Sequence, residues 1–387
     1  MIFLFLSSGL FLGWSLGAND GANVFGTAVG SKMLRFKTAA IICGIFVIIG
    51  AFISGSGTSH TINKLGSIDA IAGSFIVALA AAIAVFWMSK LKLPVSTSQA
   101  IVGSIIGWNF FAGLTTNINS LLSITSAWVI SPILAGIFAI VIYRIIKIIL
   151  AKANIHLLRL DLYTRLGLIL VCASGAYSLG ANNIANVMGV FVSVSPFQDI
   201  NVFDLFTLSS MQQLFIFGGL AIAVGVFTYS HKVIETVGSN IFKLSPEAAL
   251  AVVLSNTLVL FMFSSVKLQQ WLISYGLPSL PLVPISSSQA VVGAVIGIGI
   301  IKGARSIRYK VLGEIAFGWV ITPIIAGIIS FIALFIIQNV FNQKVSGSSE
   351  IYKSNQIIEQ RETFRSTMNN KPSNPDRSGE FHLTRRS

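Results

Sequence analysis

Two heptapeptides of this chain are near copies of each other: Gly17–Asn23 reads GANDGAN, and Gly180–Asn186 reads GANNIAN. Two more motifs follow each heptapeptide in the same order. Pro94–Gly103 (PVSTSQAIVG) returns as Pro284–Gly293 (PISSSQAVVG), and Trp128–Gly136 (WVISPILAG) returns as Trp319–Gly327 (WVITPIIAG). Because three motifs that contain polar residues recur in the same order, we predict that the chain contains two copies of one structural repeat.

The residues around these motifs have the composition of a membrane protein. Hydrophobic types make up 54% of the 387 residues and charged types only 10%, against about 25% charged residues in a soluble domain. Long apolar blocks match the roughly 20 residues that a helix needs to cross the hydrocarbon core. The net charge of +13 is typical of basic loops that orient a protein in the lipid bilayer. We therefore expect an all-α polytopic membrane protein that binds no nucleic acid.

The first copy contains five predicted membrane segments. They are Met1–Met33, interrupted at the first heptapeptide, Thr38–Ile53, Ala70–Met88, Val95–Ala112 and Ser123–Tyr143. An odd number of segments turns the second copy over, which predicts inverted-topology repeats with broken helices; a pair of segments could instead form a re-entrant hairpin. The predicted boundaries are 1–150 for the first repeat, 151–165 for a cytoplasmic linker and 166–341 for the second repeat. The second copy is longer, and its extra residues are expected near 193–206 and 267–281.

Basic residues predict the orientation of the chain. The loops after the first, third and fifth segments carry Arg35, Lys37, Lys90, Lys92 and further basic residues between 144 and 165. The positive-inside rule places these loops in the cytoplasm and both termini outside a multi-pass plasma-membrane protein. Residues 342–387 are polar and lack apolar periodicity, so we predict a disordered tail.

The heptapeptides are predicted cation sites. Irregular backbone inside lipid is tolerated where it lines a cavity or packs against protein, and carbonyl, amide and carboxylate oxygens suit a hard cation such as sodium. An intramembrane carboxylate such as Asp20 indicates function by default; the alternative is a kink that Asp20 caps. The candidate cation ligands are Asn19, Asp20, Asn23, Asn182, Asn183 and Asn186.

The two hydroxyl-rich motifs are predicted anion sites. Proline and then Ser or Thr are typical of a helix start, where free N–H groups and the positive end of the helix dipole attract anions. Two such starts would form a cradle for a tetrahedral oxyanion, although ordinary helix capping is the alternative. The candidate anion ligands are Ser96, Thr97, Ser98, Gln99, Ser286, Ser287, Ser288 and Gln289.

These features favour a secondary transporter for an inorganic oxyanion. The sequence contains no G-x-x-x-x-G-K motif, which would indicate ATP-driven transport. It also contains no metal triad and no nucleophile–base pair, which would indicate an enzyme. Phosphate is the leading substrate, with symport by alternating access. A sulfate or other oxyanion permease, a proton-coupled symporter and an anion channel are the alternatives. No cofactor is expected beyond sodium as the coupling ion.

The paired motifs resemble those of the inorganic phosphate transporter (PiT) family. The resemblance rests on GANDGAN followed by Val24–Gly30 (VFGTAVG), and on the PVSTS and PISSS motifs; it extends from Met1 to about Phe341. It implies a cation-coupled phosphate symporter with inverted repeats, helical hairpins and a homodimeric assembly. It also implies phosphate and sodium ligands at Asp20, Asn23, Asn183, Asn186, Ser96, Thr97, Ser98, Ser286, Ser287 and Ser288, with Gln99 and Gln289 beside them.

The chain departs from the family pattern at three positions. Asn183 stands where many members have Asp, which removes one charge from the second heptapeptide and leaves the number of bound cations open. Gln99 and Gln289 stand where many members have His. Because glutamine does not titrate, we expect sodium rather than protons to drive transport.

Overall fold

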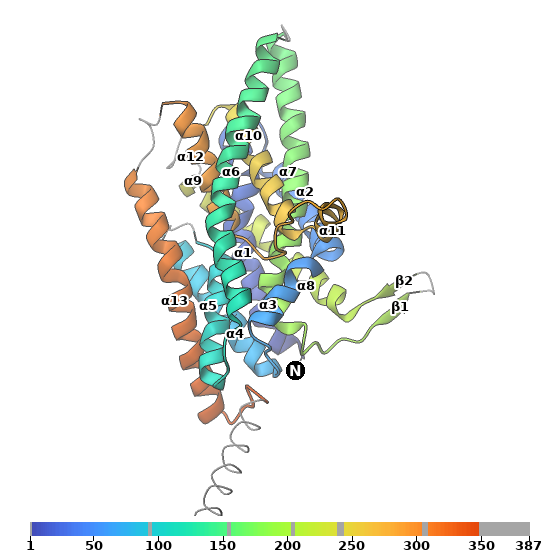
Figure 1. The fold of residues 1–387 in the computed structure, drawn as a ribbon, viewed down its shortest axis with the longest axis vertical. Helices are drawn as coiled ribbons and strands as arrows, with labels where there is room; N and C mark the ends of the chain where they lie inside the picture. Colours follow the sequence, from blue (N-terminus) through green and yellow to red (C-terminus); the bar gives the residue numbers. More distant parts are fainter. Residues whose placement is uncertain are drawn as a thin grey trace, which may run out of the picture. The chain divides into compact units, whose positions relative to one another are not determined.

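The computed structural model describes residues 2–91, 95–152, 156–202, 206–237, 244–303 and 309–347. Its helices and strands belong to one compact unit, Met1–Ser346 (Figure 1). The first copy forms α1 (Ile2–Gly30), α2 (Phe36–Ser54), α3 (Ser56–Leu65), α4 (Ile71–Lys90), α5 (Thr97–Ala112) and α6 (Ile118–Lys152). The second copy forms α7 (Leu157–Met188), η1 (Gly189–Phe191), β1 (Ile200–Val202), β2 (Phe206–Leu208), α8 (Ser210–Thr228), α9 (Ser230–Val237), α10 (Pro246–Ser264), α11 (Val266–Ser274), α12 (Ser287–Ile301) and α13 (Tyr309–Asn339).

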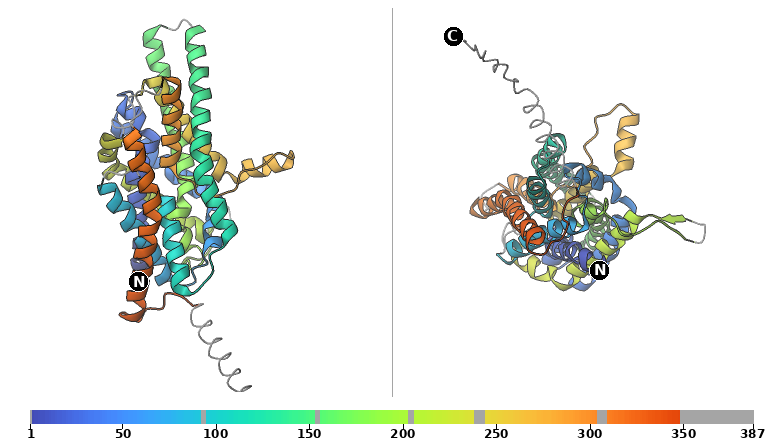
Figure 2. Two further views of the ribbon diagram at one scale, coloured as in Figure 1. Left: turned by 60° about the vertical axis from the view of Figure 1, so that its left-hand side comes forward. Right: turned by 90° about the horizontal axis from the view of Figure 1, so that it is seen from below.

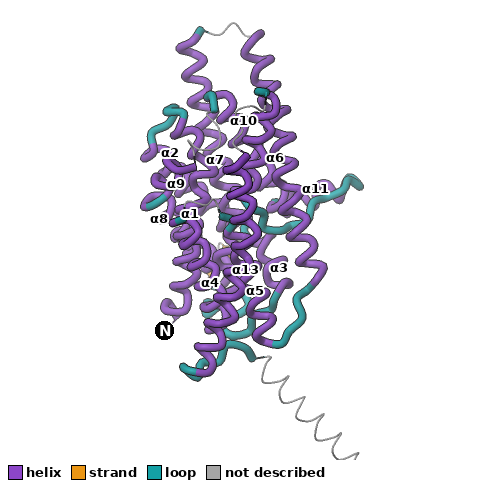
Figure 3. The backbone as a smooth tube through the Cα atoms, turned by 90° about the vertical axis from the view of Figure 1, so that its left-hand side faces the viewer, coloured by secondary structure: helices purple, strands orange, loops and turns teal. Residues whose placement is uncertain are grey.

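The predicted all-α membrane fold is confirmed. Within the described residues, 8 helices are long and apolar enough to cross a membrane: α1, α2, α4, α6, α7, α8, α10 and α13. The helix α12 is apolar but shorter, as is α5 with 16 residues. Helices dominate the fold (Figure 3), and the described strands are limited to the small antiparallel hairpin β1–β2.

The predicted break at the heptapeptides is wrong. The helix α1 continues through Gly17–Asn23, and α7 continues through Gly180–Asn186. Glycine and asparagine weaken an isolated helix, but here neighbouring elements use them. A Cβ on Gly17 would overlap the carbonyl oxygen of Ile222 in α8, and Asn19 donates a hydrogen bond to the carbonyl of Val95. The two residue types therefore serve close packing and side-chain bonding within a regular helix.

Two predicted connections are largely helical. The loop expected after α2 contains α3, which follows α2 directly at Gly55; its polar composition hid it from a search for apolar spans. The predicted linker 151–165 contains the end of α6 and the start of α7. These two helices extend beyond the apolar blocks that predicted them, because their ends do not need to face lipid.

The extra residues of the second copy form elements that project from the helices, whereas the start of the predicted tail packs against the unit. The extra residues of the second copy coincide with the β1–β2 hairpin and with α11, which has no buried residue; both project from the helices (Figure 2). The tail was predicted to begin at residue 342, but Val345 is buried and its carbonyl accepts a hydrogen bond from the indole of Trp108. This start of the tail is therefore packed, because one apolar side chain anchors it. The rest of the predicted tail, from residue 348, lies outside the described residues.

The two copies exchange packing partners. The helix α1 packs against α8, and its counterpart α7 packs against α2. In the same way α5 packs against α13, and α12 packs against α6. A helix of the first copy and its counterpart in the second copy therefore pack against equivalent helices of the opposite copy. This reciprocity supports two structural repeats; their inverted direction across a membrane stays a prediction.

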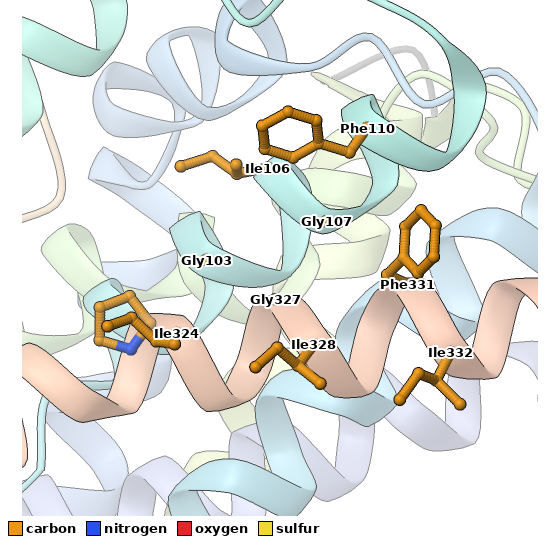
Figure 4. A pocket seen from close by; sticks show the side chains of 10 residues that line it. Gly103, Ile106, Gly107, Phe110, Ile324, Gly327, Ile328, Phe331 and Ile332 are labelled. Atoms are coloured by element: carbon orange, nitrogen blue, oxygen red, sulfur yellow. The ribbon is translucent and has the colours of Figure 1, made fainter.

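Glycines make the closest of these contacts possible. A Cβ on Gly103 of α5 would overlap the carbonyl oxygen of Pro323 in α13, and a Cβ on Gly293 of α12 would overlap the carbonyl oxygen of Pro132 in α6. Figure 4 shows Gly103 and Gly107 where α5 crosses α13. A side chain at either Gly103 or Gly293 would push two helices apart.

We expect Gly103→Ala to lower the melting temperature of the detergent-purified protein. The added methyl group meets backbone that cannot rotate away, and overpacking of this kind costs about 1–3 kcal/mol. Gly313→Ala in α13 is the control, because no atom lies within 4 Å of the added Cβ; there alanine should be neutral or stabilising by up to about 1 kcal/mol. Equal melting temperatures for Gly103→Ala and wild type would contradict the packing argument.

Candidate functional site

The heptapeptides and the hydroxyl triplets meet in the interior of the unit. The heptapeptides lie on α1 and α7, and the triplets lie at the starts of α5 and α12. Each of the fourteen predicted site residues is at most 8% exposed. A polar cluster of this size within apolar helices requires that most of its members bond with one another.

The first serine of each triplet caps a helix. The hydroxyl of Ser96 accepts a hydrogen bond from the backbone N–H of Gln99 at 3.3 Å, and the hydroxyl of Ser286 accepts one from the N–H of Gln289 at 3.3 Å. The capping alternative is therefore right for these two serines. Both helices begin at the cluster, so the positive ends of their dipoles lie there.

The third residue of each triplet reaches across to the other copy. Ser98 donates to the carbonyl of Ile285 at 3.0 Å, and Ser288 donates to the carbonyl of Val95 at 2.8 Å. Val95 and Ile285 occupy equivalent positions, each directly before its triplet. The two triplets are thus in contact although they are far apart in the sequence.

An asparagine of each heptapeptide holds the same carbonyl groups. Asn19 donates to the carbonyl of Val95 at 3.1 Å. Asn182 donates to the carbonyl of Ile285 at 2.9 Å and also accepts from the Ile285 N–H at 3.1 Å. Both polar ends of the Asn182 side chain are therefore engaged with backbone, which makes this residue a clamp for the extended segment before α12.

The remaining heptapeptide residues connect the carboxylate to the triplets. The amide of Asn23 donates to Asp20 at 3.4 Å and to Ser287 at 3.1 Å. In the second copy, the amide of Asn186 donates to Asn183 at 2.9 Å and to Ser98 at 2.8 Å. Asn183 thus takes the place of Asp20, with an amide oxygen as the acceptor instead of a carboxylate.

Five buried polar atoms of this cluster have no hydrogen-bond partner among the described residues. They are Thr97 Oγ1, Gln99 Oε1, Asn183 Nδ2, Asn186 Oδ1 and Gln289 Oε1. Buried polar atoms are nearly always satisfied, so a group of exceptions in one place indicates a ligand. Oxygen atoms of this kind can coordinate a hard cation, while a hydroxyl or an amide N–H can donate to an anion. The described residues contain no group of three or more His, Cys, Asp and Glu residues that could hold a metal ion.

A pocket elsewhere does not carry this chemistry. It has a volume of about 720 Å³ between α5 and α13, and side chains such as Ile106, Phe110, Ile328 and Phe331 line it (Figure 4). Its lining consists of glycine, isoleucine, phenylalanine and proline, so no lining side chain could bind an ion.

Sequence reasoning missed the contribution of α3. Thr58 of this helix is buried, and its hydroxyl lies 3.4 Å from the carbonyl of Ala181 and 3.3 Å from that of Asn182. The polar run GSGTSH at residues 55–60 is the signal that could have identified α3. Such a run inside a membrane protein indicates a polar interior, as it does in the heptapeptides.

The chain is similar to known proteins over most of its length. The sequence profile of a family described as "Phosphate transporter family" matches residues 16–330 and 276–373. A protein of Methanocaldococcus jannaschii named as a phosphate permease is 31% identical over 82% of this chain and 91% of its own length. A similarly named protein of Pyrococcus abyssi is 29% identical over 86% of this chain and 96% of its own length. A solved structure described as "The sodium-dependent phosphate transporter" shares the fold, with a TM-score of 0.67 and 22% identity over 87% of this chain and 98% of that one.

We expect Asn182→Ala to destabilise the protein strongly. The substitution leaves the buried N–H of Ile285 without its partner, and such an unsatisfied group costs about 1–3 kcal/mol. The carbonyl of Ile285 keeps only its hydrogen bond from Ser98. The melting temperature of the purified protein measures the loss. Asn119→Ala is the control, because Asn119 is exposed and only its backbone carbonyl accepts a hydrogen bond. A similar small effect from both substitutions would show that the clamp contributes little.

Proposed function

The chain belongs to the phosphate transporter family, a family of membrane transporters rather than of enzymes, and we propose that it imports inorganic phosphate by sodium symport through alternating access. One observation carries this proposal. Hydroxyl triplets at two helix starts, one from each copy, meet in a buried cluster that contains a carboxylate and five unpaired polar atoms. The names of the relatives, phosphate permease, and of the structural neighbour, sodium-dependent phosphate transporter, are consistent with it.

In this proposal the anion binds at the triplets. The unpaired hydroxyl of Thr97 and the hydroxyl of Ser287 donate to phosphate oxygens, and the starts of α5 and α12 contribute their positive dipole ends. The motifs contain no lysine or arginine. Since a buried phosphate dianion is costly without compensating charge, cations must accompany it.

Sodium would supply that compensating charge. The Asp20 carboxylate, the unpaired Asn186 oxygen and the Asn183 oxygen are the ligands we assign to it, and Asn19 and Asn182 hold the adjacent backbone. Protons fit less well. The four histidines of the chain are His60, His156, His231 and His382, and none of these is a motif residue that could cycle its charge beside the anion.

The assembly and the orientation also belong to the proposal. The family resemblance implies a homodimer in the plasma membrane. The basic loops imply that both termini are extracytoplasmic.

We expect purified protein in liposomes to accumulate labelled phosphate when an inward sodium gradient is applied, and Asp20→Asn to abolish that accumulation. Asp20 is the only carboxylate in the motifs, so its loss weakens cation binding while an isosteric amide keeps the packing. Accumulation driven by a pH gradient without sodium, or preference for sulfate over phosphate, would contradict the proposal. Near-normal gradient-driven uptake by Asp20→Asn would refute the role of that residue.

We expect Thr97→Val and Ser287→Ala each to weaken phosphate binding by comparable amounts. Losing one hydrogen bond to a charged ligand costs about 1.5–3 kcal/mol, which is roughly 10- to 150-fold in affinity. Titration of phosphate into purified protein in sodium buffer measures the change. Ser104→Ala is the control, because Ser104 is buried on α5 but donates to Ala326 outside the cluster. Loss of binding in only one of the two variants would contradict a shared site.

A further inference from the structure

A polar pocket of about 780 Å³ lies beside α3, away from the buried cluster. Residues from α3, from the start of α6, from α11 and from the segment before α12 line it. The lining is Ser56, Gly57, His60, Thr61, Lys64, Asn117, Asn119, Ser120, Ser123, Val266, Gln269, Pro281, Leu282 and Val283. The pocket is large enough to admit an ion together with part of its hydration shell.

The charge of this pocket favours an anion. Ser56, His60 and Lys64 are exposed residues at successive four-residue intervals on one face of α3, so their side chains line the same wall. The lining contains one lysine, one histidine and no carboxylate. Arg165 and Asp161, which form a salt bridge, both lie on α7 and do not line this pocket. Lys64 is therefore an uncompensated positive charge in a concave surface, where the field attracts anions.

Two elements connect this pocket to the buried cluster. Thr61, which lines the pocket, donates to the carbonyl of Leu282 at 2.6 Å. Leu282 and Val283 line the pocket as well, and Ile285, which Asn182 clamps, follows shortly after them along the chain. The same helix reaches the cluster through Thr58. A shift of α3 or of residues 282–285 would join the pocket to the site.

The position of the pocket along α6 indicates on which side of the membrane the pocket opens. The lining residues Asn119, Ser120 and Ser123 are at the start of α6, and Asn117 directly precedes it. Arg144, Lys147 and Lys152 are near the other end of this helix. The helix has 35 residues, which corresponds to a length of about 52 Å (Figure 1). Because the positive-inside rule assigns the basic end to the cytoplasm, the pocket opens to the outside.

We propose that this pocket is an extracytoplasmic vestibule in which Lys64 and His60 collect a hydrated inorganic oxyanion, phosphate in this chain, before it enters the buried cluster. The inference rests on the proposed function and adds to it a second, weaker anion site. Lys64 acts by raising the local anion concentration. It therefore affects the capture of phosphate and not the maximal rate of transport.

The first test is the ionic-strength dependence of uptake by Lys64→Gln. At low ionic strength and fixed sodium, we expect the KM for phosphate to rise about 3- to 10-fold with an unchanged maximal rate, and we expect Lys64→Glu to raise it further. Choline chloride should reduce the difference from wild type, because salt screens exposed charges. Lys37→Gln is the control, since Lys37 is an exposed residue at the start of α2, in a loop region assigned to the cytoplasm and outside the lining, and should leave KM unchanged.

The second test uses accessibility from the two sides of the membrane. In a background that replaces Cys43 and Cys172, the two cysteines of the chain, a membrane-impermeant maleimide added outside should modify Ser56→Cys and inhibit uptake. Ser67→Cys is the control, because Ser67 is exposed near α3 but does not line the pocket; its modification should leave uptake unchanged.

The outcomes separate the two proposals. If wild type transports phosphate but Lys64→Gln keeps the wild-type KM at every ionic strength, the vestibule is wrong and the proposed function stands. Inhibition of Ser56→Cys only by reagent inside the vesicles would also overturn the vestibule. If wild type shows no phosphate uptake, both proposals fail.

Discussion

The whole arrangement depends on the backbone polar groups of two residues that directly precede the hydroxyl triplets inside the unit. Val95 and Ile285 precede the two triplets, and their carbonyl groups lie where no regular helix can bond them. Each carbonyl receives one hydrogen bond from an asparagine of its own copy and one from a serine of the other copy. An unpaired carbonyl in a dry interior costs several kcal/mol, so these four bonds hold the triplets, the heptapeptides and both copies in one place.

These hydrogen bonds distinguish polar residues that have a structural role from polar residues that are free to bind a ligand. Ser96 and Ser286 cap helices, and Asn182 clamps backbone, so each of these side chains has a structural role. The atoms without partners belong to Thr97, Gln99, Asn183, Asn186 and Gln289. Each motif therefore contains some residues that hold the backbone in place and others whose polar atoms can bind a ligand, although the sequence does not distinguish them. The difference between Asp20 and Asn183 makes the two halves of the cluster unequal in charge, although Asn19 and Asn182 donate to equivalent carbonyl groups.

The sequence predicted the membrane class, the repeat and the residues that converge, because apolar length and recurring motifs are local properties that survive folding. Prediction from the sequence failed where the local structure depends on contacts with residues that are distant in the sequence. Gly17 and Asn19 suggested a broken helix, yet α8 and Val95 provide the contacts that keep α1 regular. The short helix α3 buries Ile62 and Leu65, but its otherwise polar sequence does not resemble an apolar membrane span. Val345 appeared to belong to a disordered tail because a single buried side chain leaves no periodic signal.

The exchange of hydrogen bonds between the copies also constrains the ancestry of the fold. A chain with only one copy would leave the carbonyl that corresponds to Val95 or Ile285 with half of its partners, and its helices would lack the neighbours that α8 or α2 provide. Such a chain could complete its interior only by pairing with a second molecule. A half-length precursor of this architecture would therefore have been a dimer of identical copies. Joining the two copies in one chain allows equivalent positions to differ, as Asp20 and Asn183 do.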